Sequence, residues 1–269
     1  MIEEVGGWPR RQSGEPAILL AHRGGSGPWR ENTLEAFAAG LRLGADGVEF
    51  DVRRTSDGRL VVHHDAEVAG IGPIHRLRAT ELPDWIPGLD DALAACAGAT
   101  VNVEIKNAPV EPGFDPDETA AVEVAAALAA VVGGREDTPA HLIVSSFWPA
   151  SLHVVHREAP TLPLGLLVHP AFDATEAAGQ AATMGCTALH PFHAQATPAL
   201  VEAVHDLGLS VAVWTVNDDA DLAAVAAAGV DVVISDRVKE SRQALDAAVS
   251  ARSDAGLVRG AHPRGQSTP

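Results

Sequence analysis

Acidic side chains stand inside two segments that otherwise have the composition of buried strands. In the segment 47–52, GVEFDV, Glu49 and Asp51 share one face, and Glu104 occupies the matching place in VNVEIK. Successive side chains of a strand alternate between its faces, so the apolar residues of both segments take the face opposite to the acids. A buried carboxylate without a partner costs several kcal/mol or takes up a proton. These acids therefore need positive charge nearby.

Two sources of positive charge could meet this need. Carboxylate oxygens suit hard ions, so three clustered acids favour one divalent cation, Mg²⁺ or Ca²⁺, over zinc, which prefers imidazole and thiolate. The alternative is a set of salt bridges with inward basic residues, chiefly Arg23 and Lys106. We expect the metal, because three acids outnumber these two basic partners.

Two histidines accompany the acids at predicted strand ends. The first predicted strand ends in AHRGG, where His22 continues the inward face and an arginine and glycines follow. After the second strand the chain turns at Asp57–Gly58, a strong hairpin signal, and returns as VVHHD. The hairpin should bring His64 back to the place where Asp51 lies, whereas strand alternation turns His63 away.

Eight short β-rich segments alternate with longer Ala/Leu-rich segments of helical period. This alternation predicts an α/β fold, a (β/α)₈ TIM barrel with an extra β-hairpin and a short insertion after strand 2; an open doubly wound sheet is the weaker option. A capping box of Asn32 and Glu35 is expected to start the first helix. The predicted strands are 17–22, 47–52, 100–105, 141–146, 163–168, 187–191, 210–216 and 230–235.

One catalytic barrel domain is expected over residues 1–249, because 269 residues suit a single barrel of this kind. The insertion is placed at about 66–87, and the polar segment 250–269, with its glycines and prolines, is predicted to be a disordered tail. Active sites of such barrels lie at the C-terminal ends of the strands. The acids and histidines are all assigned to that end.

The composition narrows the class of partner. A hydrophobic fraction of 46% with 20% charged residues indicates a globular protein with a substantial core. The net charge of -17 argues against nucleic acid or an anionic membrane surface as the main partner, and a small-molecule substrate that is an anion would need local positive charge to overcome this sign. Cys96 and Cys186 are expected to be buried free thiols. The sequence has no export signal and no apolar run long enough for a membrane span, so we expect no stable membrane insertion and a cytoplasmic location.

Combined, these motifs point to a known family. AHRGG, ENTLEAF, GADGVEFDVRRTSDGRLVVHHD, VEIK, VAVWTVND and GVDVVISD occur in this order across about residues 18–236. They resemble the glycerophosphodiester phosphodiesterase family. The resemblance implies a (β/α)₈ barrel that hydrolyses glycerophosphodiesters to an alcohol and sn-glycerol 3-phosphate with Mg²⁺ or Ca²⁺. It also implies acid–base catalysis by histidine through a cyclic phosphate, in lipid and glycerol metabolism.

Carried over position by position, the resemblance assigns the metal to Glu49, Asp51 and Glu104. It assigns acid–base catalysis to His22 and His64.

The resemblance further places Arg23 and Lys106 on the phosphate and Trp214 on the wall of the site. Arg30 stands where the family commonly has proline. The insertion also departs from the family pattern, so the specificity for the leaving alcohol does not carry over.

Other interpretations remain open. A metal-assisted enolising barrel also uses inward acids and a lysine, but it leaves the His-Arg-Gly motif and the hairpin histidine unexplained. A catalytically inactive phosphate-binding barrel is disfavoured because every expected catalytic position is filled. Trp214 is equally compatible with core packing, and Ser146 with a hydrogen bond beside the site or a plain strand-end hydroxyl. His190 is expected to be a structural histidine with its hydrogen bonds satisfied.

Overall fold

A closed barrel of eight parallel strands forms the centre of the protein, in a computed structural model that describes residues 3–5, 7–12, 14–131 and 139–260. The last strand pairs with the first, which closes the barrel and confirms the predicted TIM-barrel fold. Its strands are β3 (Ile18–His22), β4 (Gly47–Arg54), β8 (Thr100–Ile105), β9 (His141–Ser146), β10 (Leu164–Val168), β11 (Ala188–Pro191), β12 (Ser210–Val213) and β13 (Val232–Ser235).

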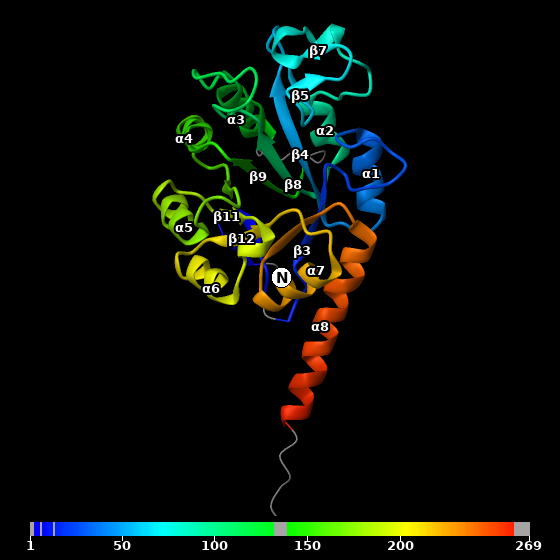
Figure 1. The fold of residues 1–269 in the computed structure, drawn as a ribbon, viewed down its shortest axis with the longest axis vertical. Helices are drawn as coiled ribbons and strands as arrows, with labels where there is room; N and C mark the ends of the chain where they lie inside the picture. The colour runs from blue at the N-terminus through cyan, green and yellow to red at the C-terminus, as the bar shows by residue number, and fades with distance from the viewer. Residues whose placement is uncertain (1–2, 6, 13, 132–138, 261–269) are drawn as a thin grey trace, which may run out of the picture.

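Helices surround the barrel on its outer side (Figure 1). They are α1 (Leu34–Arg42), α2 (Leu89–Ala95), α3 (Thr119–Val131), α4 (Pro149–Glu158), α5 (Ala174–Thr183), α6 (Pro198–Asp206), α7 (Asp219–Ala228) and α8 (Val238–Gly260). Helix α6 illustrates why they begin where they do: the Thr197 side chain accepts a bond from the Leu200 amide, and proline fills the first helical position. Helix α8 enters the segment 250–269 that the sequence assigns to a tail, and residues 261–269 lie outside the described residues.

Two apolar layers hold the barrel together. Outward strand residues pack on the helices, as where Phe50 of β4 stacks on Phe37 of α1 with ring centroids 5.5 Å apart. Inside the barrel lies a second cluster, whose largest member is the fully buried Trp8. Trp8 belongs to an N-terminal hairpin of β1 (Glu3–Val5) and β2 (Trp8–Arg10). The other members of the inner cluster are Ile18, Leu20, Ile143, Ala188, Ala212, Val232 and Ile234.

The predicted hairpin after the second barrel strand is present. Strand β5 (Leu60–Val62) runs antiparallel to the end of β4, with Val52 opposite Val62. The insertion that follows holds a small antiparallel sheet, β6 (Glu67–Val68) with β7 (Gly72–Pro73), and two 3₁₀ turns, η1 (Ile74–Arg76) and η2 (Ala79–Glu81). Val61, Val68, Ile74 and Ile86 give it an apolar core of its own.

The cysteines and the helices test two other expectations, the buried free thiols and the lack of a membrane span. Cys96 and Cys186 are both buried and free, as predicted, and burial raises the pKa of each thiol to about 12. Across the described parts of the chain, every helix is too short or too polar to span a bilayer.

Candidate active site

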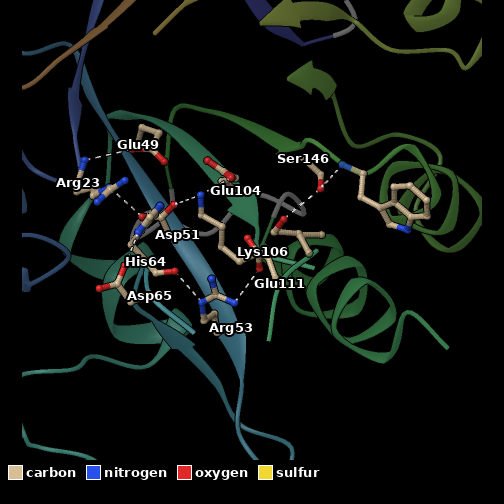
Figure 2. Close-up of polar contacts among 12 residues, drawn as sticks. Arg23, Glu49, Asp51, Arg53, His64, Asp65, Glu104, Lys106, Glu111 and Ser146 are labelled. Carbon is tan, nitrogen blue, oxygen red and sulfur yellow. Dashed lines mark hydrogen bonds and ion pairs between the residues drawn. The ribbon is translucent and has the colours of Figure 1, made fainter. Parts of the chain in front are cut away.

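A small pocket opens at the C-terminal ends of the barrel strands, with a volume of about 130 Å³. Seven of the eight residues that the sequence predicts for the site line it; only Asp51 does not. Asp51 is fully buried and lies against the wall of the pocket, where Arg23 and Lys106 contact it (Figure 2). The fold therefore brings the whole predicted set together. The lining residues of the predicted set are His22, Arg23, Glu49, His64, Glu104, Lys106 and Trp214.

Strand register explains why the three acids meet. In β4 and β8, Asp51 lies opposite Glu104, and in β3 and β4, His22 lies opposite Glu49. All of these positions fall on the inward face of their strands, because residues two apart share a face. One oxygen from each of the three carboxylates lies within 4.8 Å of the others, and all three residues are buried.

Two basic residues neutralise part of this cluster. Arg23 Nε lies 3.2 Å from Asp51 Oδ2, and Lys106 Nζ lies 3.1 Å from Asp51 Oδ1 and 2.5 Å from Glu104 Oε1. The salt bridges weighed as the alternative to a metal are thus present for two of the acids. Glu49 differs: its Oε2 accepts from the Arg23 backbone amide at 3.1 Å, and its buried Oε1 has no hydrogen-bond partner among the described residues.

The pKa directions reflect this unequal neutralisation. Burial, and next the charge of Asp51, raise the pKa of Glu49 to about 8. Burial also acts to raise the pKa of Asp51, but the charges of Lys106 and Arg23 outweigh it and hold that pKa below its usual value. For Glu104 burial dominates over Lys106, and the pKa is raised.

The cluster therefore has room for more positive charge than its basic residues supply. The oxygens come from carboxylates alone, the donor set that Mg²⁺ and Ca²⁺ prefer. Glu49 Oε1 is a buried acceptor without a partner among the described residues, and Asp51 Oδ1 and Glu104 Oε1 share one cation, the ammonium of Lys106. The residues present fit a hard divalent cation, and Glu49, Asp51 and Glu104 form a candidate metal site.

His22 is held by a residue from the opposite end of the chain. Its Nδ1 lies 2.7 Å from Asp236 Oδ1, and Asn217 Nδ2 donates to the other oxygen of Asp236 at 2.6 Å. An ionised carboxylate can only accept, so Nδ1 carries the proton, and the other ring nitrogen, Nε2, lies 3.8 Å from Glu49 Oε2. Burial acts to lower the pKa of His22, but the bond to Asp236 and the charge of Glu49 outweigh it and raise the pKa.

His64 is oriented in a similar way on the hairpin. Its Nδ1 lies 2.8 Å from Asp65 Oδ1, and its backbone oxygen accepts from Arg53 Nε at 2.7 Å (Figure 2). Arg53 is itself anchored to Glu111 at 3.0 Å. Burial, and next the charge of Lys106, lower the pKa of His64. The predicted difference from His63 is confirmed, since that ring packs edge-on against Trp85.

Sequence reasoning missed one residue beside Asp51. Asn32 has a left-handed backbone, with φ of 55°, and its Nδ2 donates to Asp51 Oδ2 at 2.8 Å. The predicted capping box is wrong, because the side chain that caps α1 belongs to Thr33, which accepts from the Ala36 amide. The Asn-Thr pair before the helix is the signal that could have suggested that the threonine caps the helix and the asparagine contacts the site. Asp236 was also missed, although it ends the quoted motif GVDVVISD.

The remaining candidates have mainly structural contacts. The Trp214 indole donates to the His190 carbonyl at 2.8 Å and packs edge-on against Phe147, while its ring also lines the pocket. The Ser146 hydroxyl donates to the Ile105 carbonyl and accepts from the Trp148 amide, both at 3.1 Å, so it ties β8 to the start of α4 (Figure 2).

The expectation for His190 is wrong in one respect. Both of its ring nitrogens are buried without a hydrogen-bond partner among the described residues, and burial lowers its pKa to about 3. The ring occupies space that the neighbouring strand leaves open: a Cβ on Gly165 would come within 2.5 Å of His190 Nε2. The imidazole thus behaves as a neutral packing group.

Comparison with known proteins identifies relatives of this chain. The sequence model of the Glycerophosphoryl diester phosphodiesterase family matches residues 22–240. A glycerophosphodiester phosphodiesterase of Caldanaerobacter subterraneus is 32% identical over 240 residues, which cover 81% of this chain and 93% of that protein.

Solved structures of two phosphodiesterases are also similar to this chain. A glycerophosphodiester phosphodiesterase from Thermotoga maritima superposes with a TM-score of 0.67 at 27% identity, over 84% of this chain and 97% of that one. An Oleispira antarctica phosphodiesterase, solved in complex with the product sn-glycerol-3-phosphate, superposes with a TM-score of 0.72 at 26% identity, over 86% and 97%.

Proposed function

Because the chain belongs to the Glycerophosphoryl diester phosphodiesterase family, we propose that it hydrolyses glycerophosphodiesters to an alcohol and sn-glycerol 3-phosphate by metal-assisted acid–base catalysis. Membership of this family makes the chain a hydrolase, a glycerophosphodiester phosphodiesterase. The observation that carries the mechanism is the meeting of three buried carboxylates and two carboxylate-oriented histidines around one pocket.

The reaction first requires that the negative charge on the phosphate be stabilised. Glu49, Asp51 and Glu104 would hold one Mg²⁺ or Ca²⁺ ion, which when bound stabilises negative charge on the non-bridging oxygens of the phosphate. Arg23 and Lys106 line the same pocket and add fixed positive charge to it. This local charge opposes the net charge of -17 that the whole chain presents to an anionic substrate.

The two histidines divide the proton transfers. In the proposed first step the neighbouring glycerol hydroxyl attacks phosphorus, one histidine accepts its proton, and the other protonates the departing alcohol as its P–O bond breaks. Water then opens the cyclic phosphate with the proton roles reversed. The bonds from Nδ1 of His22 to Asp236 and from Nδ1 of His64 to Asp65 leave Nε2 of each ring for these transfers.

The rival enolising enzyme needs a lysine that can act as a base. Burial acts to lower the pKa of Lys106, but Glu104 and Asp51 outweigh it and hold that pKa above its usual value. A lysine that stays protonated suits phosphate binding and not proton abstraction. The contacts of Lys106 therefore favour the phosphodiesterase over the enolising barrel.

Turnover of glycerophosphocholine tests the proposal. With Mg²⁺ or Ca²⁺ present we expect release of sn-glycerol 3-phosphate and choline, loss of activity after chelation, and recovery when the ion is returned. Glu49→Gln should give a protein that folds but no longer regains activity with the ion. Full activity in excess chelator, or no product with either ion, would refute the proposed chemistry.

A further inference from the structure

The two site histidines differ in how their ring partners are attached to the barrel. The ring of His22 is held by Asp236, which directly follows another barrel strand, β13. The ring of His64 is held by Asp65, its neighbour in the chain, whose side chain is 73% exposed. A bond between neighbours orients the ring relative to its own segment, but it does not fix that segment to the barrel. The position of His64 therefore depends on a further contact.

The main chain at His64 lies beyond the paired part of the hairpin. Residues 52–54 pair with residues 60–62, and the next backbone bond runs from the His63 amide to the Asp51 carbonyl. His64 belongs to no helix or strand, and in the described parts of the chain no backbone–backbone hydrogen bond involves it. Because a backbone carbonyl that leaves a sheet still requires a donor, a side chain has to supply the partner.

Arg53 supplies that partner from a barrel strand. It continues the inward series of Glu49 and Asp51 along β4 and is only 9% exposed. Its Nε donates to the His64 carbonyl at 2.7 Å, and its Nη1 donates to Glu111 Oε2 at 3.0 Å (Figure 2). Glu111 lies in the chain that follows β8. Since the guanidinium is planar and rigid, these two bonds join the hairpin to β4 and to the β8 side of the site in one fixed geometry.

We propose that Arg53 is a positioning residue for His64, whose imidazole it holds at the distance from the phosphate that proton transfer requires. This inference rests on the proposed function. Arg53 is not among the described residues that line the active-site pocket, so it acts through His64 and not on the substrate. A displacement of about 1 Å can lower a rate by about 10²-fold. The loss on removing Arg53 cannot exceed the loss on removing His64 itself.

Removal of the guanidinium in two backgrounds tests the inference. Arg53→Met keeps an apolar side chain of similar length but lacks both donors, so we expect kcat on glycerophosphocholine to fall about tenfold while KM stays nearly constant. In a His64→Ala background the same substitution should lower kcat no further, because the group that Arg53 positions is already absent. A fall by the same factor in both backgrounds would overturn the inference, as would an unaltered kcat in the native background.

Arg54 provides the matched control. It neighbours Arg53 on β4, but its side chain takes the other face, where Nε and Nη2 lie 2.7 and 2.9 Å from the two carboxylate oxygens of Glu123 on α3. Arg54→Met removes an ion pair from the same strand and should leave kcat unaltered. An equal loss from both arginine variants would contradict a specific role for Arg53, because it would indicate general support of the hairpin.

Arg53→Lys separates the hydrogen bonds from the charge, in a chain that keeps a cation at this position. An ammonium is a single point charge on a flexible stem and does not present two donors in a fixed fork. We therefore expect most of the tenfold loss to remain in Arg53→Lys, again only where His64 is present. Full activity of this variant would show that charge alone suffices and would overturn the positioning role.

The results separate this inference from the proposed function. A native chain that hydrolyses glycerophosphocholine while Arg53→Met matches its kcat overturns the inference alone. Absence of turnover by the native chain would remove the proposed function, and the inference with it. Urea unfolding of each variant shows which losses of kcat belong to the folded protein.

Discussion

The two ends of the barrel interior have opposite characters, although the same strands build both. At the lower end, Ile18 and Leu20 of β3 pack with Trp8 in an apolar cluster that admits no charge. One step further along the same inward face, His22 meets Glu49 and the cluster of ionisable side chains begins. Position along the strand, and not the choice of strand, separates residues that hold the barrel together from residues that carry chemistry.

The largest change expected is at the lower end. Trp8→Ala removes a fully buried indole, and large-to-small substitutions of this kind cost about 3–5 kcal/mol of unfolding free energy. Urea unfolding measures the loss, while kcat on glycerophosphocholine should be retained where the variant is folded. Unchanged stability would mean that the inner apolar cluster does not depend on Trp8.

Substitution at the upper end should produce the reverse pattern. His22→Ala and His64→Ala are each expected to lower kcat by at least about 10²-fold, because each removes a proton-transfer group. Unfolding by urea should be little altered. His153→Ala, an exposed histidine of α4, is the matched control and should keep full activity. Near-normal rates from either site variant would remove that histidine from the proposed chemistry.

The pH dependence of stability tests whether His190 belongs to the apolar part of the barrel interior. Its pKa is about 3 in the fold because of burial and about 6.5 when unfolded, so the unfolded chain binds the proton first as the pH falls. Stability from this residue is complete above about pH 6.5, and about 2 kcal/mol of it should be lost between pH 7 and pH 5.

Comparison with His190→Leu isolates this contribution. The variant should lose less stability than the native chain over the same interval in urea unfolding at the two pH values. Parallel losses would show that the native imidazole accepts a proton in place and belongs with the polar end.

The smallest effect is expected from Asp236, which we regard as a positioning residue for His22. Asp236→Asn can present an amide donor to Nδ1 and so favour the wrong tautomer, for which we expect a loss of about tenfold in kcat. Because the bond to Asp236 helps to raise the pKa of His22, the variant should also shift the limb of the pH–rate profile that His22 controls toward lower pH. A fall in rate without this shift would indicate a purely structural role.

Local rules predicted the barrel and most of the site. Alternation placed Glu49, Asp51 and Glu104 on inward faces, and the hairpin rule returned His64 to them, because both depend only on neighbours in the sequence. The contacts that escaped prediction are distant ones. Asn32 fits a helix cap by local rules, yet its partner Asp51 lies on the next strand.

Distance in the sequence limited the other predictions in the same way. The bond between His22 and Asp236 joins the C-terminal ends of the first and last barrel strands, which no local pattern specifies. A hollow at the barrel rim, lined by residues 108–111, 147–149 and 166–169, is likewise assembled from three separate segments. Packing inside the barrel also determines the state of His190. Its position near a strand end resembles that of His22, but its ring nitrogens have no hydrogen-bond partner among the described residues.

The pairing of β4 with β8 links the activity of the pocket to the correct alignment of the barrel strands. At Gly47 the strands approach so closely that a Cβ would lie 1.9 Å from the Thr100 oxygen, and this fit holds the pairing that sets Asp51 opposite Glu104. A slip by one residue would turn every acid of β4 toward the helices. During refolding, then, catalytic competence can return only with the right alignment of these strands, and regain of activity would time that event.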